Sequence, residues 1–177
     1  MGDEIEVKCL IREENRTFAK STFYNYFNSV WDLKKQIYQR GHLIDQGYLP
    51  LEKGILLADN LDIIFDFSPK EARLRKTNGK FYFTLKGTGR TSRPEKEVII
   101  DENIFYDNWN LTEGKRIKKI RMEHPFLEYI AEFDLYLDRK LITSEVEVPT
   151  LQIAKSLPLL GKEISEDTRY KNKNLAR

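Results

Sequence analysis

Pairs of like-charged residues two positions apart recur along this sequence, and they restrict its fold more than any other feature. In a β-strand, side chains alternate between the two faces, so residues i and i+2 point the same way. Each pair therefore places two charges of one sign on one face of a strand. The pairs are Glu4 and Glu6, Arg73 and Arg75, Glu95 and Glu97, Lys119 and Arg121, Glu132 and Asp134, and Glu145 and Glu147.

The opposite faces of the same segments are apolar. Residues 4–11 show this most clearly, because Ile5, Val7, Cys9 and Ile11 alternate with Glu4, Glu6 and Lys8. This period of two is typical of a strand that packs one face on a core. Apolar alternation also accompanies the later pairs, at Val98 and Ile100, Phe133 and Leu135, and Val146 and Val148.

The order of these segments predicts an antiparallel sheet. Asn78-Gly79 between two strand-like runs is a strong hairpin signal. We expect strands at 4–11, from 46 onward, and at 72–76, 80–86, 95–100, 115–123, 127–137 and 141–148. We expect helices at 22–40, 103–111 and 150–156, and we assign no element to 54–67. The fold class is therefore α+β, a closed antiparallel β-barrel of about eight strands with flanking helices.

Length and composition narrow the class further. The 177 residues suit one domain, which we expect to span 1–177. The net charge is only +2, from 30 basic and 28 acidic residues, and no basic stripe with interleaved aromatics occurs, which argues against a nucleic-acid partner. The single cysteine excludes an internal disulfide. The N-terminus does not resemble a signal peptide, and no apolar run is long enough to span a membrane, so we expect a cytoplasmic protein with no membrane partner.

The charged faces allow two interpretations. They could be ordinary solvent-exposed strand faces, but like charges on neighbouring positions repel and need a partner of opposite sign. They could instead line the inside of the barrel, where about eight strands leave room for one small ligand. Carboxylate oxygens suit Mg²⁺, and Arg and Lys suit phosphate oxygens. A polyphosphate with bound metal ions would need both signs of charge, which favours the second interpretation.

Several short motifs resemble those of the CYTH superfamily, also called the triphosphate tunnel metalloenzymes, which includes inorganic triphosphatases, thiamine triphosphatases and class IV adenylyl cyclases. Glu4-Ile5-Glu6-Val7-Lys8 resembles its ExExK signature, and Gln46-Gly47-Tyr48-Leu49 its QGYL segment. The later matches follow in the family's order over nearly the whole chain. They are Arg73-Leu74-Arg75, Thr84-Leu85-Lys86-Gly87, Arg93-Pro94-Glu95-Lys96-Glu97, Lys119-Ile120-Arg121, Phe133-Asp134, Ser144-Glu145-Val146-Glu147 and Leu160-Gly161-Lys162-Glu163-Ile164-Ser165.

The resemblance implies a role for each charged pair. Mg²⁺ or Mn²⁺ would be the cofactor, and its ligands would be Glu4, Glu6, Glu145 and Glu147. The phosphate-binding residues would be Arg73, Arg75, Lys86, Lys119 and Arg121. Lys8, with Glu4 and Glu6, would orient or activate the attacking water. The remaining carboxylates, which would hold a second metal ion or balance the cations, are Glu95, Glu97, Glu132 and Asp134.

The resemblance also implies an activity. We expect a metal-dependent hydrolase of inorganic tripolyphosphate or of a small organic or nucleoside triphosphate, bound in a charged tunnel. Two alternatives remain open: an adenylyl cyclase that makes cyclic AMP from ATP, and a triphosphate-binding module without turnover. Met122 follows Arg121 where the family often has tyrosine. The sequence does not decide the preferred triphosphate, the metal, the role of residues 21–41 and 54–66, or whether the chain forms a homodimer.

Overall fold

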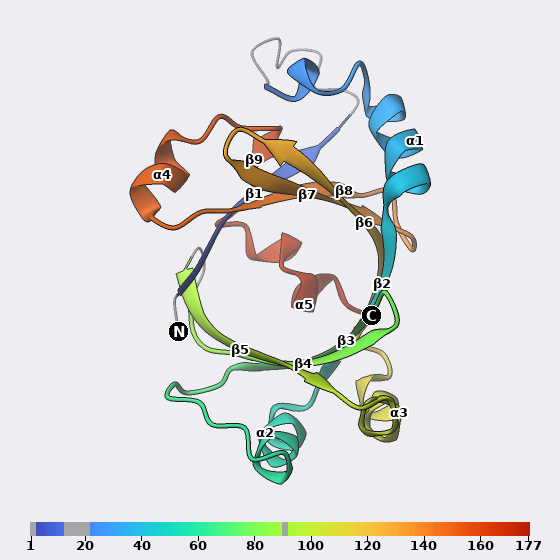
Figure 1. Ribbon diagram of the computed structural model, residues 1–177, viewed down its shortest axis with the longest axis vertical. Helices are drawn as coiled ribbons and strands as arrows, with labels where there is room; N and C mark the ends of the chain where they lie inside the picture. The colour runs from blue at the N-terminus through green and yellow to red at the C-terminus, as the bar shows by residue number, and fades with distance from the viewer. Residues whose placement is uncertain (1–2, 13–21, 90–91) are drawn as a thin grey trace. The chain divides into compact units, whose positions relative to one another are not determined.

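A computed structural model describes residues 3–12, 22–89 and 92–177; the side chains of Asp3, Glu4 and Ser92 lie outside this description. The chain is α+β, as expected, with helices beside a large antiparallel sheet (Figure 1). The strands are β1 (Asp3–Ile11), β2 (His42–Leu49), β3 (Glu71–Thr77), β4 (Lys80–Lys86), β5 (Ser92–Ile100), β6 (Arg116–Phe126), β7 (Tyr129–Tyr136), β8 (Ile142–Glu147) and β9 (Lys162–Glu163). The helices are α1 (Val30–Arg40), α2 (Leu51–Asn60), α3 (Glu102–Trp109), α4 (Leu151–Ser156) and α5 (Asn172–Leu175), with short 3₁₀ turns η2 (Thr22–Asn25), η3 (Asn110–Thr112) and η4 (Thr168–Tyr170).

The described strands form one sheet of nine strands in the order β5-β4-β3-β2-β6-β7-β8-β1-β9. The expectation of about eight strands was therefore one short. The additional strand is β9, which pairs with β1 at Cys9↔Glu163 and Leu10↔Lys162. A strand of two residues has too few positions to show a period of two, so the sequence pattern could not reveal it. The closed barrel stays a prediction.

The long helix expected over 22–40 is interrupted. Residues 22–25 form η2, and α1 begins only at Val30. Ser29 causes the restart, because its hydroxyl oxygen accepts a hydrogen bond from the Asp32 amide at 3.0 Å, which caps the helix. The helix ends before Gly41, as expected. The unassigned segment from residue 54 proves to be the second half of α2 followed by a loop.

The chain divides into two compact units. The first lies within Met1–Glu4, Ile44–Lys118 and Thr168–Arg177, and the second comprises Ile5–Leu43 and Lys119–Asp167. Both contain a core formed by the apolar faces of their strands. Whether they act as the single domain expected from the sequence stays a prediction.

In the first unit, α2 and α3 cover the same face of the β3–β4–β5 meander (Figure 1). Apolar side chains from this face and from the two helices form the core, among them Leu57, Leu74, Phe83 and Phe105. Asn78 and Gly79 close the β3–β4 hairpin with positive φ values of 50° and 71°, as the sequence signal predicted. Because residues alternate along the strands, the face opposite to the helices carries the charged residues of β3, β4 and β5.

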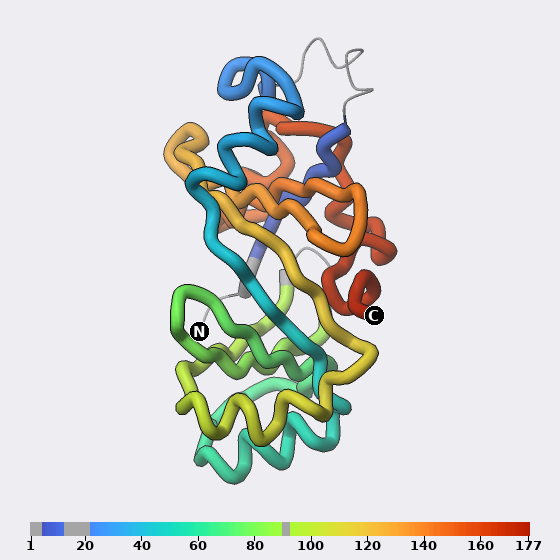
Figure 2. The backbone as a smooth tube through the Cα atoms, turned by 90° about the vertical axis from the view of Figure 1, so that its right-hand side faces the viewer, coloured from blue at the N-terminus to red at the C-terminus, as the bar shows by residue number. Residues whose placement is uncertain are grey.

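In the second unit, α1 lies beside the β6–β7 hairpin, where it contacts β7 (Figure 2). Its apolar residues Leu33 and Ile37 are fully buried. They join a core built from the apolar faces of β1, β6, β7 and β8, which includes Val7, Cys9 and Phe133. The opposite faces of these strands again carry charged residues. No helix of the described residues is long and apolar enough to cross a membrane.

The contact between α2 and β3 is close enough to predict the effect of one added methyl group. A Cβ atom at Gly54 would lie 2.1 Å from the Cβ of Ala72, so Gly54→Ala must push the helix away from the strand. Although alanine favours a helix by about 1 kcal/mol over glycine, overpacking should win and lower the free energy of unfolding by about 1–3 kcal/mol. Urea unfolding would measure this. Lys53→Ala, on the exposed side of α2, should change stability by less than about 0.5 kcal/mol, and a stabilised Gly54→Ala would contradict the prediction.

Candidate active site

The charged face of the first unit is arranged in rows that cross three neighbouring strands. Register places Arg73 of β3 opposite Thr84 of β4, which in turn lies opposite Glu97 of β5. The adjacent row is Glu71, Lys86 and Glu95. Since directly opposite side chains lie about 4.5–5.5 Å apart, this register brings each cation within reach of a carboxylate.

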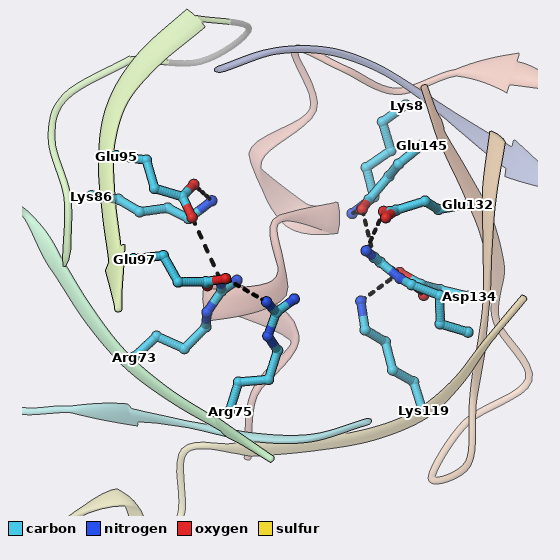
Figure 3. A network of polar contacts seen from close by, with 11 residues as sticks. Lys8, Arg73, Arg75, Lys86, Glu95, Glu97, Lys119, Glu132, Asp134 and Glu145 are labelled. Atoms are coloured by element: carbon cyan, nitrogen blue, oxygen red, sulfur yellow. Dashed lines mark hydrogen bonds and ion pairs between the residues drawn. The ribbon is translucent and has the colours of Figure 1, made fainter. Parts of the chain in front are cut away.

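Glu97 is the centre of these contacts (Figure 3). It accepts hydrogen bonds from Arg73 Nη2 at 3.2 Å and from Arg75 Nη2 at 2.7 Å. The Thr84 hydroxyl donates a third, at 2.7 Å. In the next row, Lys86 forms an ion pair with Glu95. The cations of this face are therefore held by carboxylates of the same face.

Burial and charge act against each other in this group. Arg73 is only 8% exposed. Burial opposes its charge, but Tyr48 and Glu95 outweigh it and raise the pKa of Arg73. Burial likewise opposes ionisation of Glu97, but Arg75 and Arg73 hold its pKa below the ordinary value. The buried Nε of Arg73 has no hydrogen-bond acceptor among the described residues.

In the second unit, the buried ion pair between Arg121 and Asp134 dominates the charged face. The fully buried Asp134 accepts hydrogen bonds from Arg121 Nε at 2.7 Å and Nη2 at 2.6 Å. The same guanidinium donates to Glu145 at 2.8 Å and to Glu132. Burial raises the pKa of Glu132 despite the attraction of Arg121, whereas Arg121 and Lys119 overcome burial and lower the pKa of Asp134.

Lys8 reaches this network from β1. Its ammonium forms an ion pair with Glu145 at 2.5 Å (Figure 3). Its main-chain N–H donates to the Ser165 hydroxyl oxygen at 3.0 Å. Burial opposes the charge on Lys8, but Glu145 and the other anionic groups outweigh it and raise its pKa. Burial also opposes ionisation of Glu145, yet Lys8 and Arg121 hold its pKa well below the ordinary value. Lys8 therefore stays protonated at any physiological pH.

Lys119 behaves differently, although it too is buried and bound to a carboxylate. Its Nζ lies 2.5 Å from an oxygen of Asp134 and 5.8 Å from the centre of the Tyr136 ring. Burial and the neighbouring Arg121 lower the pKa of Lys119 to about 8, and the attraction of Asp134 does not compensate for them. The direction of this pKa shift is thus opposite to that of Lys8.

The glutamates expected to bind metal ions differ in their exposure and in their partners. Glu6 of β1 lies directly opposite Glu147 of β8, and Glu145 lies on the same face of β8 as Glu147. Glu147 is exposed, whereas Glu145 is engaged by Lys8 and Arg121. The side chain of Glu4 lies outside the description. Among the described residues, no group of three or more His, Cys, Asp or Glu side chains forms a ready metal cage.

Among the residues of these faces to which the sequence analysis gave no role are two uncharged ones, Thr84 and Tyr136. Thr84 bridges Arg73 and Glu97, and Tyr136 lies opposite Lys119. Both stand two positions from a charged residue, Thr84 from Lys86 and Tyr136 from Asp134, so their place on the charged face follows from strand alternation. They were overlooked because they are uncharged.

Comparison with known proteins extends these observations. The chain is 34% identical over 134 residues to an inorganic triphosphatase of Nitrosomonas europaea. This alignment covers 72% of this chain and 84% of the relative. It is 32% identical over 152 residues to an inorganic triphosphatase of Acetivibrio thermocellus, and this alignment covers 81% of this chain and 94% of the relative. No family model matches the sequence.

Solved structures agree with this. The crystal structure of an inorganic triphosphatase matches 99% of this chain and 95% of its own, with a TM-score of 0.56 and 27% identity. A proposed adenylate cyclase from Bacillus halodurans matches 89% of this chain and 87% of its own, with a TM-score of 0.51, but at 16% identity it is similar in fold alone. The fold and its charged faces thus define a member of the CYTH, or triphosphate tunnel, superfamily, and within it the chain belongs to the inorganic triphosphatase family.

The network around Asp134 predicts a large effect of a small substitution. Asp134→Asn keeps the shape of the side chain but leaves Arg121 with less compensating charge, so the free energy of unfolding should fall by about 3–5 kcal/mol. Because the pKa of Asp134 is lowered in the folded state, its stabilising effect is present above the ordinary aspartate pKa and is lost as pH falls through the folded value. The variant should therefore lose part of the acid dependence of stability.

Urea unfolding at several pH values, from neutral down to the acid limit, would measure both effects. Asp138→Asn is a suitable control, because Asp138 is exposed and forms an ion pair with Arg139, its neighbour in the sequence. The control should change stability by less than about 1 kcal/mol. Equal effects of the two substitutions would contradict the importance assigned to the buried pair.

Proposed function

We propose that this protein hydrolyses inorganic triphosphate to pyrophosphate and orthophosphate in a metal-dependent reaction. The observation that carries the proposal is the set of buried cations on the charged strand faces, because guanidinium and ammonium groups are the side chains that bind phosphate oxygens. Their exposed fractions are 5% for Lys8, 8% for Arg73, 3% for Lys86, 1% for Lys119 and 9% for Arg121. The activity named for the two sequence relatives supports the same conclusion.

The first unit would bind part of the phosphate chain. Arginine forks match phosphate oxygens in a bidentate way, and lysine adds a point charge. Arg73, Arg75 and Lys86 supply these groups on adjacent strands, and the Arg73 Nε is a buried donor that still needs an acceptor. A phosphate oxygen would satisfy it.

The second unit would position and activate the attacking water. Lys8 stays protonated, so its role would be to hold an oxygen by hydrogen bonding and not to accept a proton. Lys119 has the lowered pKa that a general base needs, and Asp134 fixes the position of its amine. Arg121, fixed by three carboxylates, would stabilise negative charge that develops on the transferred phosphoryl group.

The carboxylates of β1 and β8 fit a divalent metal ion. Glu6 and Glu147 face each other in register, and like charges in such a pair repel unless a cation lies between them. Mg²⁺ typically binds through one or two carboxylates together with substrate phosphates and water, and Mn²⁺ favours similar oxygen ligands. Glu6 and Glu147, with Glu4 and Glu145 as further ligands, would hold the ion. When bound, it would neutralise charge on the phosphate oxygens.

Three further properties belong to this proposal. The sheet would close into the tunnel expected from the sequence, which the pairing of β5 with β1 supports. Glu95, Glu132 and Asp134 would balance cations, as their ion pairs suggest, and would not hold a second metal ion. A cytoplasmic location and a homodimer stay predictions.

Product analysis tests the function directly. With Mg²⁺ or Mn²⁺ and tripolyphosphate, the purified protein should release orthophosphate and pyrophosphate in equal amounts, and ATP and thiamine triphosphate should be turned over more slowly. Glu147→Gln should require a higher metal concentration for half-maximal rate, because one carboxylate ligand is lost. Glu128→Gln, at an exposed position of the β6–β7 turn, is the control. Cyclic AMP as the main product from ATP, or binding without turnover, would contradict the proposal.

The role given to Lys119 predicts a pH dependence. An amine with a pKa of about 8 is protonated at lower pH and cannot act as a base, so kcat should rise with pH up to about 8 and then level off. Lys119→Arg keeps the positive charge but cannot be deprotonated, so kcat should fall by about 100-fold or more and this rise should disappear. Lys118→Arg, at the adjacent position with a half-exposed side chain, should keep the wild-type profile. An unchanged profile in Lys119→Arg would exclude Lys119 as the base.

A further inference from the structure

The carboxylate of Glu97 accepts hydrogen bonds from both arginines of β3. The two oxygens of Glu97 accept hydrogen bonds from Arg73 at 3.2 Å and from Arg75 at 2.7 Å. The Thr84 hydroxyl fixes the same carboxylate at 2.7 Å, and Thr84 itself is fully buried. Glu97 is thus held in place from two neighbouring strands, with 27% of its side chain exposed.

This arrangement makes Glu97 a competitor of any anion that binds the two arginines. A carboxylate and a phosphate group use the same guanidinium N–H groups as donors. A phosphate that binds through Nη2 of Arg73 or Arg75 must therefore compete with Glu97 for that donor. Lys86 is held in the same manner by Glu95, so the neighbouring cation offers no easier point of entry.

We propose that Glu97 is a specificity-determining residue: an internal anion that holds Arg73 and Arg75 in place and yields them only to a phosphate chain carrying more charge than a carboxylate. The inference rests on the proposed binding of triphosphate by these two arginines, and it decides between the two roles considered for Glu97, in favour of charge balance over metal binding.

The consequence is a threshold for binding. A small anion such as orthophosphate must displace Glu97 for the sake of one or two new contacts, so it gains little. A triphosphate chain has several charged groups and can contact Lys86 as well as the two arginines, which lie on adjacent strands. Its total gain can therefore exceed the loss of the Glu97 contacts, and long phosphate chains are selected over short ones.

The test compares the anion affinities of wild type and variants in buffer that contains EDTA, so that the metal-dependent reaction does not take place. Isothermal titration calorimetry would measure the affinity of wild type and Glu97→Gln for tripolyphosphate and for orthophosphate at one ionic strength. Glu97→Gln should bind tripolyphosphate about tenfold more tightly or better, since the competing charge is gone. Its affinity for orthophosphate should rise by a larger factor, so the preference for the long chain should shrink.

Asp45→Asn is the matched control. It removes one negative charge from the same unit, but Asp45 pairs with Lys118 at 3.5 Å and lies on the other face of β2 from Gln46, which is opposite Arg75. Its affinities should equal those of wild type. If Glu97→Gln does not fold, Thr84→Val keeps the carboxylate but removes the hydroxyl that fixes it, and should increase both affinities by a smaller factor.

Unchanged or weaker tripolyphosphate binding in the folded variants would overturn the proposal, and so would an equal gain in Asp45→Asn. An unaltered preference between the two anions would overturn the role in specificity. Mn²⁺ titration gives a separate check: weaker metal binding by Glu97→Gln would identify Glu97 as a metal ligand and also overturn the proposal. Wild-type turnover of tripolyphosphate, measured separately, decides the proposed function, so the two can fail independently.

Discussion

The ion pair between Arg121 and Asp134 is the interaction on which the charged face of the second unit depends. Removing a guanidinium and a carboxylate from water is unfavourable, and only short, well-directed hydrogen bonds offset this. Asp134 accepts two such bonds from Arg121 and one from Lys119. Arg121 is thereby oriented towards Glu132 and Glu145, and Glu145 in turn holds Lys8. The orientation of the remaining charged groups on this face follows from that one pair.

The same compensation explains why so many cations can be buried in a small protein. Each is matched by a carboxylate from the neighbouring strand or, for Arg73, from the strand beyond it, and strand register decides the partner. Arg73 lies one strand from Thr84 and two from Glu97, while Lys86 lies directly opposite Glu95. The charges that suit a phosphate chain are thus part of what keeps the ligand-free protein folded.

Much of this architecture could be read from the sequence, and the reasons are physical. Alternation along strands is a local property, so Glu145 and Arg73 could be placed on charged faces without knowing the fold. Partner choice is not local: that Lys8 would pair with Glu145 depends on which strands become neighbours. The lowered pKa of Lys119 was equally hidden, because it results from burial and from Arg121 in three dimensions. Ser29 did carry a capping signal, but the aromatic residues before it imitated helical spacing and concealed the break.

The order of the strands also has a consequence for how the protein folds. The meander β3–β4–β5 joins strands that follow one another in the chain, and its first turn has the geometry of a tight hairpin. Such local pairings form quickly, whereas pairing β1 with β8 requires closing a loop that contains most of the chain. Arg73, Thr84 and Glu97 should therefore meet early in folding. Lys8 should reach Glu145 late, so in the states that precede this step Arg121 is the cation that holds Glu145, and the Lys8 ammonium still keeps its water.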